Sequence, residues 1–209
     1  MSKEITFYTN PMSRGRIARW MLEETGVPYH TEYLDFGTTM KAPAYLAVNP
    51  MGKVPAIRHG ETVVTECAAI CAYMAEAFPD ADLAPAADER GPYYRWMFFA
   101  AGPLEMAVTN RALGFEPPKD RLRMIGCGRF DEAMDALEQA VSGTPYVVGD
   151  RFTAADVYVG SQVGWGLRFG SIEKRPAFID YWERVSNRDA YRRATEIDNA
   201  AIPAQQSMH

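Results

Sequence analysis

The order of strand-like and helix-like segments constrains the fold of this chain more than any other feature. Over residues 1–80, segments in which apolar and polar residues alternate are interleaved with segments whose apolar residues recur at helical spacing. Prolines and glycines separate many of these segments, as is typical of the ends of strands and helices. The pattern predicts the order β-α-β-α-β-β-α, with strands at 3–9, 29–36, 54–59 and 62–65 and helices at 13–25, 42–47 and 66–78.

The rest of the chain is predicted to be helical. Residues 81–90 are polar, rich in alanine and without periodicity, which indicates a linker. We therefore expect an α/β domain over 1–80 and an all-α domain over 91–209. Helices are predicted at 91–115, with a kink at Pro103, and at 119–141, 152–169, 175–187 and 189–198.

The helix predicted at 152–169 begins with a capping sequence. It is apolar nearly all round, which is typical of a buried helix. The Thr153 hydroxyl and the Asp156 carboxylate can each satisfy a backbone N–H of the first turn. We therefore interpret Asp156 as a structural residue rather than a catalytic one.

Composition excludes several classes of protein. The net charge of −5 over 209 residues argues against a nucleic-acid-binding surface. There is no run of about 18 apolar residues and no secretory leader, so we expect a soluble cytoplasmic protein without a membrane partner. Three cysteines, none in a CxxC pair, and three scattered histidines predict neither a disulfide framework nor a metal site.

The segment 49–55, Asn-Pro-Met-Gly-Lys-Val-Pro, places a proline at the first residues of a predicted strand. Proline cannot donate to a sheet ladder, so its presence there indicates a special role for the backbone. If the Val54–Pro55 bond is cis, the N–H and C=O of Val54 are exposed to a peptide-like ligand. An ordinary turn from loop to strand is the alternative, and this motif alone does not decide between them.

The chain resembles a cytosolic glutathione transferase over essentially its whole length. The resemblance rests on the order and spacing of Ser13-Arg14, the 49–55 motif, Glu66 after the hairpin, and Gly149-x-x-x-Thr153-x-x-Asp156. It implies a thioredoxin-like N-terminal domain joined to an all-α domain, glutathione as co-substrate, no prosthetic group, and a homodimer. The bacterial members with a serine at helix one are the expected subgroup.

The resemblance also implies how glutathione is held. Val54, before a cis Pro55, pairs through its backbone with the cysteinyl part of glutathione. Lys53 offers its ammonium to the glycyl carboxylate, with Lys41 as a second candidate or a solvated surface lysine. Glu66 accepts the γ-glutamyl ammonium, while the helix that begins there attracts the neighbouring carboxylate.

Position 67 departs from the family pattern, because most relatives have serine or threonine where this chain has Cys67. A thiol is a weaker hydrogen-bonding group, so we expect the backbone N–H of Cys67 to matter more than its side chain. A cysteine at a helix N-terminus can also react with oxidants, which leaves a redox role as the alternative to a tolerated substitution. Cys71, one turn later, is expected in the core.

Two residues are candidates for the group that activates the glutathione thiol. Ser13 stands where serine-type and cysteine-type relatives have their activating residue. The neighbouring Arg14 is a candidate glutathione-binding residue that raises the local potential, and the alternative is an arginine on the helix surface. Tyr8 lies in the region where tyrosine-type relatives have theirs, but the spacing after it differs. We favour Ser13.

The electrophile is expected against the helical domain. Pro103, Met106 and Asn110 are predicted to line an apolar pocket for it, with Trp165 and Phe169 as weaker candidates. The alternative is that these side chains belong to the core or to a dimer interface.

We therefore expect a glutathione S-transferase of the detoxifying kind, in which the thiolate attacks a small hydrophobic electrophile and forms a thioether. One alternative is a non-catalytic binding or regulatory protein with the same fold. Another is a glutathione-dependent thiol reductase or peroxidase that uses Cys67. The physiological electrophile cannot be predicted from the sequence.

Overall fold

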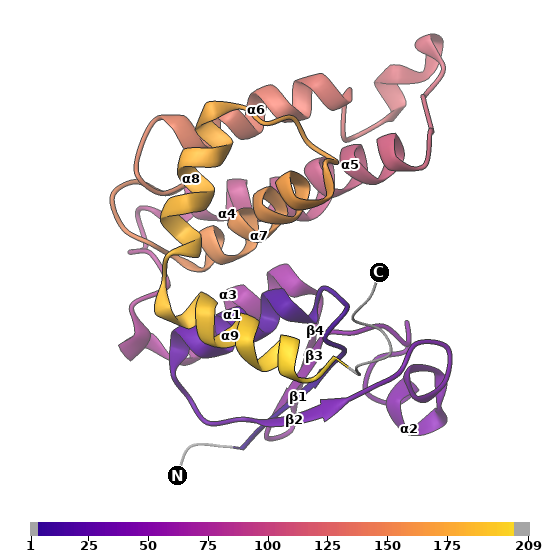
Figure 1. Ribbon diagram of the computed structural model, residues 1–209, viewed down its shortest axis with the longest axis vertical. Coiled ribbons are helices and arrows are strands. Elements are labelled where there is room, and N and C mark those ends of the chain that lie inside the picture. Colours follow the sequence, from indigo (N-terminus) through magenta and orange to yellow (C-terminus); the bar gives the residue numbers. More distant parts are fainter. Residues whose placement is uncertain (1–3, 203–209) are drawn as a thin grey trace. The chain divides into compact units, whose positions relative to one another are not determined.

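The computed structural model describes residues 4–202, which form two compact units (Figure 1). The first unit contains the chain up to Leu83 together with the segment that begins at Arg188. The second unit contains Ala84–Asn187. The chain therefore leaves the first unit once and returns to it near its C-terminal end.

The first unit is built on a mixed four-stranded sheet of order β2-β1-β3-β4. Strand β2 is parallel to β1, whereas β3 is antiparallel to β1 and forms a hairpin with β4. The predicted β-α-β unit and the predicted hairpin are both confirmed. The strands are β1 (Ile5–Thr9), β2 (His30–Tyr33), β3 (Ala56–His59) and β4 (Thr62–Thr65).

Helices α1 (Gly15–Thr25) and α3 (Cys67–Ala77) pack against each other beside this sheet. The predicted end of this helix at residue 25 is confirmed: Gly26 follows it with a left-handed φ of 66°, and the Gly26 amide closes the last turn of α1. A short helix, α2 (Pro43–Leu46), follows a 3-10 turn, η1 (Thr39–Lys41), and a second such turn, η2 (Pro79–Ala81), follows α3.

The last helix, α9 (Asp189–Ala200), packs on α1 within the first unit. Arg19 of α1 and Asp198 of α9 form a buried ion pair, with 2.7 Å between Nε and Oδ1. The sequence placed all of 91–209 in one helical domain, and in this respect the observed units differ. The return of α9 depends on tertiary contacts with α1, this ion pair among them, which periodicity does not reveal.

The second unit is helical. Pro103 lies in a π-helical turn, η3 (Ala100–Leu104), where the missing proline N–H removes one intrahelical hydrogen bond. The predicted helix at 119–141 is interrupted, because a 3-10 segment, η4 (Lys119–Met124), gives way to a turn with Gly128 at a φ of 65°. The α-helices are α4 (Arg90–Phe99), α5 (Glu105–Ala112), α6 (Phe130–Ser142), α7 (Ala154–Phe169) and α8 (Pro176–Ser186).

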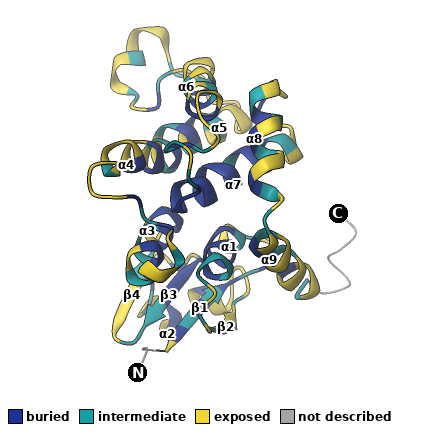
Figure 2. Ribbon diagram, turned by 90° about the vertical axis from the view of Figure 1, so that its left-hand side faces the viewer, coloured by how far each residue is buried: buried dark blue, intermediate teal, exposed yellow. Residues whose placement is uncertain are grey.

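Helix α7 is the buried centre of the second unit (Figure 2). The predicted capping box is confirmed: the Thr153 hydroxyl accepts from a first-turn amide, and the Asp156 carboxylate accepts from the amide of Thr153. Gly164 allows α8 to approach closely, since a Cβ there would lie 2.5 Å from the ring of Trp182. None of the helices within residues 4–202 combines the length and the apolar character of a membrane span.

Candidate functional site

The loop before β3 is held by two side chains that converge on the carbonyl of Lys53. The Tyr45 hydroxyl donates to this oxygen over 2.6 Å, and the side-chain amide of Asn49 donates over 2.7 Å. Gly52, at a φ of 57°, has no room for a side chain, because a Cβ would lie 2.7 Å from a backbone oxygen. These contacts give the loop one defined path into the strand.

Val54 lies just before β3, and its bond to Pro55 is cis. The ladder between β3 and β1 begins at Ala56, so the backbone of Val54 lies beyond it. Within residues 4–202, no hydrogen bond reaches the amide or the carbonyl of Val54. An extended ligand can therefore pair with both groups as an added strand.

Glu66 joins β4 to α3 and has an unusual backbone, with φ 67° and ψ 122°. A positive φ is uncommon outside glycine, and residues held in this way concentrate at ligand sites. The Glu66 carboxylate is exposed, and the first amides of α3, which have no intrahelical partner, follow it directly. A carboxylate beside a helix N-terminus can hold both charges of an α-amino acid group.

The starts of α1 and α3 meet at Cys67. Its thiol donates to the carbonyl of Arg14 over 3.5 Å, and its side chain is 7% exposed. This contact brings Ser13 and Glu66, the neighbours of Arg14 and Cys67 in the sequence, to the same edge of the first unit. Two of the sequence motifs therefore meet in one site.

Ser13 is half-buried in the turn that begins α1. Its hydroxyl donates to the carbonyl of Asn10 over 2.7 Å and accepts from the amide of Gly15 over 2.9 Å. The N-cap position of α1 is Arg14, so the Ser13 hydroxyl stabilises the turn just before the helix and does not cap it. In this arrangement its proton is directed at Asn10.

Tyr8, the second candidate activator, is half-buried in β1. Its ring lies 5.5 Å from that of Tyr45, and both contact a small cluster with Met40 and Ala56 at its centre. Val54 packs against the same cluster, so Tyr8 is close to the loop that carries the cis bond. Within the described part of the chain, the Tyr8 hydroxyl has no hydrogen-bond partner.

The two predicted lysines differ in their contacts. Lys41 donates from Nζ to the carbonyl of Met51 over 3.0 Å, so its ammonium helps to hold the loop. Lys53 is exposed, and its ammonium forms no ion pair with residues 4–202. Of the two, Lys53 is the more available to a ligand carboxylate.

Comparison with protein families agrees with this arrangement. Residues 12–77 match the family model described as glutathione S-transferase, N-terminal domain, and residues 105–165 match the C-terminal domain of the same family. Together the two matches span more than half of the chain, in the order of its two kinds of domain.

The chain belongs to the glutathione S-transferase family.

Individual glutathione S-transferases are similar over nearly the full length. Glutathione S-transferase F10 of Arabidopsis thaliana is 26% identical over 90% of this chain and 94% of that protein. A maleylacetoacetate isomerase of Pseudomonas aeruginosa is 29% identical over 99% and 95%. The theta class transferase of Xanthomonas axonopodis pv. citri, solved with glutathione bound, superposes with a TM-score of 0.73 at 26% identity over 92% and 97%. These matches do not single out the serine-type bacterial subgroup.

Some residues that shape the transferase site were not predicted. Tyr45 and Asn49 orient the loop before Val54, and Thr9 is a buried neighbour of Gly15 at the start of α1. Asn49 offered a signal, because it opens the 49–55 motif. The roles of Tyr45 and Thr9 depend on tertiary contacts, so the local sequence pattern does not reveal them.

The residues predicted for the electrophile pocket of the transferase lie in different surroundings. Pro103 is half-buried in its π-helical turn, and Met106 is 50% exposed. Asn110 lines a pocket of the helical unit to which neither Pro103 nor Met106 contributes. Of the weaker candidates, Trp165 is half-buried and Phe169 is 72% exposed.

The three cysteines of this transferase are thiols that form no disulfide among the described residues. Cys67, Cys71 and Cys127 are all buried. Burial raises the pKa of the Cys71 thiol well above its ordinary value, so this thiol stays protonated, and its predicted place in the core is confirmed. Residues 4–202 contain no group of three or more His, Cys, Asp or Glu side chains arranged for a metal ion.

Proposed function

We propose that this chain is a glutathione transferase that joins glutathione to a small hydrophobic electrophile. The glutathione thiolate forms a bond to an electrophilic carbon, the leaving group departs with its electron pair, and the thiol proton passes to solvent. The observation that carries the proposal is the contact between Cys67 and Arg14. It sets the starts of α1 and α3 together, within one unit that also presents the unpaired backbone of Val54.

Glutathione is a tripeptide with a charged group at each end, and the site has a complement for each part. Val54 pairs with the cysteinyl amide and carbonyl, next to Pro55. Glu66 accepts the γ-glutamyl ammonium, and the backbone N–H of Cys67 binds the α-carboxylate at the N-terminus of α3. Lys53, directly before Val54 in the loop, binds the glycyl carboxylate, and Lys41 holds the loop in place.

Ser13 is the proposed activator of the thiol. A hydroxyl at the start of a helix can donate its proton to a thiolate, and the amides of the first turn also stabilise the negative charge. Here the positive charge of Arg14 lies next to Ser13 in the sequence. The Ser13 hydroxyl must turn its proton from Asn10 to the sulfur, which exchanges one hydrogen bond of about 1 kcal/mol for a bond to a charged acceptor. Tyr8 is the second candidate.

Conjugation of an activated aryl halide tests the proposal and the choice of activator. We expect Ser13→Ala to lower kcat roughly a hundredfold, because the transition state loses its donor to the sulfur. Tyr8→Phe should retain most of the activity. The ultraviolet absorbance of the bound thiolate, titrated against pH, should show a higher thiol pKa in Ser13→Ala only.

The opposite pattern would assign the role to Tyr8. Retention on immobilised glutathione without any conjugation would contradict the proposed reaction and indicate a binding protein. Because one relative is an isomerase, a cis-trans isomerisation assay on maleylacetoacetate serves as the comparison activity. The homodimer and the electrophile pocket at Pro103, Met106 and Asn110 belong to the same proposal, and light scattering tests the dimer.

A further inference from the structure

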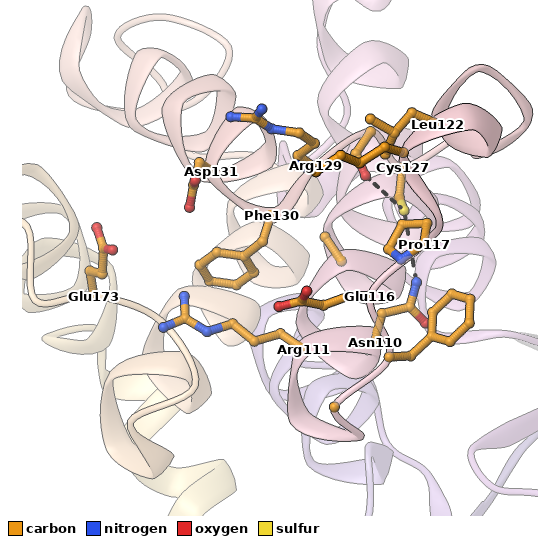
Figure 3. Close-up of a pocket in the computed structure, with 15 residues that line it drawn as sticks. Asn110, Arg111, Glu116, Pro117, Leu122, Cys127, Arg129, Phe130, Asp131 and Glu173 are labelled. Atoms are coloured by element: carbon orange, nitrogen blue, oxygen red, sulfur yellow. Dashed lines mark hydrogen bonds between the residues drawn. The ribbon is translucent and has the colours of Figure 1, made fainter.

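A pocket of about 770 Å³ lies within the helical unit, between the end of α5, the segment that follows it and the start of α6 (Figure 3). This volume is within the range of sites for small molecules, about 300–1,000 Å³. Its residues all belong to the second unit, and none is among the residues proposed to hold glutathione. One lining residue, Asn110, is also a candidate for the electrophile pocket of the proposed transferase, whereas the other two candidates, Pro103 and Met106, do not line this pocket.

The two ends of the pocket differ in chemistry. At one end, the guanidinium of Arg111 lies 4.0 Å from the centre of the Phe130 ring. At the other, Pro117 and Cys127 lie beside Asn110, whose amide nitrogen is 4.0 Å from the Cys127 sulfur (Figure 3). Cys127 is 7% exposed, so its thiol is largely shielded from water. The pocket therefore has one end with a guanidinium over an aromatic ring and another end with less polar side chains.

The charged side chains around the pocket are not equally engaged. Glu173 pairs with Arg175 over 3.1 Å, and the Nε of Arg129 lies 3.8 Å from Glu132. Among residues 4–202, no carboxylate forms an ion pair with Arg111. Its N–H groups are therefore available to a ligand, while its flat face is held on an aromatic ring.

We propose that this pocket binds a small planar aromatic carboxylate. A guanidinium stacked on a ring is weakly hydrated and presents two parallel N–H groups, which match a carboxylate. The aromatic body of the ligand then extends over Phe130 toward Pro117, and apolar contact replaces water there. Glu116 and Asp131 also line the pocket, and their negative charge selects a monoanion over a dianion.

Calorimetric titration of 2-naphthoate into the full-length protein, with glutathione at saturation, tests this site. We expect one binding event, and about tenfold weaker binding in Arg111→Gln, which loses the paired donors. The neutral analogue 2-naphthamide should bind about tenfold more weakly than the carboxylate. Glu116→Gln should bind 2-naphthoate as tightly or more tightly, because a like charge is removed.

Arg123→Gln is the matched control, since Arg123 is exposed in the same segment and does not line the pocket. Its affinity should equal that of the wild type. Equal affinity of Arg111→Gln and the wild type, weaker binding in Glu116→Gln, or no binding at all would overturn the proposal. Inhibition of the conjugation reaction by 2-naphthoate must also be compared between Arg111→Gln and the wild type. Equal inhibition of the two proteins would overturn the proposal, because 2-naphthoate would then be bound in the electrophile site.

Circular dichroism and thermal unfolding of each variant confirm that it is folded before titration. The titration does not depend on catalysis. A chain that fails to conjugate an aryl halide can still bind 2-naphthoate, and the reverse also holds, so the two proposals succeed or fail separately.

Discussion

The carboxylate of Asp156 shows how a single side chain can be predicted well from the sequence. It is fully buried and accepts hydrogen bonds from the amides of Val147 and Thr153 and from the hydroxyl of Tyr181, each over 2.9 Å. Burial raises its pKa to about 6, although these donors oppose the shift. Its oxygens are committed to the fold, which agrees with the structural role predicted from the capping sequence.

We expect the stability that Asp156 provides to fall as pH rises. Its folded pKa of about 6 exceeds the ordinary value of 3.8, so the folded state binds this proton more tightly than the unfolded state does. The resulting stabilisation is complete below pH 3.8 and is lost as pH rises through 6, a change of roughly 3 kcal/mol. Urea unfolding of the wild type and Asp156→Asn from pH 4 to 7 measures it.

Asp156→Asn is the appropriate control because it removes the titration but keeps one acceptor oxygen. The free energy of unfolding of the wild type, relative to this variant, should decrease over that range. A difference between the two proteins that stays constant with pH would contradict the expectation.

At the scale of the elements, the start of α1 is decided by its approach to β1. Gly15 has no room for a side chain, because a Cβ there would lie 1.9 Å from the hydroxyl oxygen of Thr9. Thr9 is fully buried, and within residues 4–202 its hydroxyl has no hydrogen-bond partner. The start of α1, just after Ser13, is therefore positioned by a close contact between a glycine and a strand residue.

We expect Gly15→Ala to destabilise the protein by about 2 kcal/mol, since a methyl group must be forced into a filled space. The additional change Thr9→Ala should restore most of this stability, because it removes the atom that clashes. Gly91→Ala in α4 is the matched control: no atom lies within 4 Å of its Cβ position, so stability should hold or rise. Chemical denaturation compares the four proteins. A lack of rescue by Thr9→Ala would show that another contact excludes the methyl group.

At the scale of the whole molecule, the chain closes its first unit with its last helix. Arg19 is 1% exposed; besides its ion pair with Asp198, it donates to the hydroxyls of Tyr29 and Tyr33 and lies over the ring of Phe7. A buried guanidinium requires such partners, because an uncompensated charge in the interior is costly. Helix α9 thus supplies the carboxylate that pairs with Arg19 in the first unit.

We expect Asp198→Ala to cost about 3–5 kcal/mol, because it leaves Arg19 buried without its counter-charge. The double variant Arg19→Met with Asp198→Ala should recover much of this loss. The exposed pair of Asp189 and Arg192, at 2.9 Å, provides a control, and Asp189→Asn should change stability by less than about 1 kcal/mol. A double-mutant cycle of unfolding free energies measures the coupling. A coupling energy near zero would contradict the proposed role of the pair.

Local information accounts for the parts of the site that were predicted. The 49–55 motif, the turn at Ser13 before α1 and Glu66 before α3 each depend on backbone preferences over a few residues, which can be recognised in the sequence. The contacts of Ser13 with Asn10, and of Tyr45 and Asn49 with the Lys53 carbonyl, were not predicted. They depend on which hydroxyl and amide groups reach which oxygen once the loops are folded.

The sequence by itself determined the order of the elements, the α/β and all-α halves, the capping box at Thr153 and Asp156, and the family. Periodicity and capping residues act within one helix or strand, so they can be recognised in the sequence without knowledge of the fold. Only the tertiary structure decided that α9 returns to the first unit, that Cys67 meets Arg14, and that a pocket opens beside Arg111. These features depend on contacts between residues far apart in the chain. Such contacts are determined by tertiary packing, and local sequence patterns do not encode them.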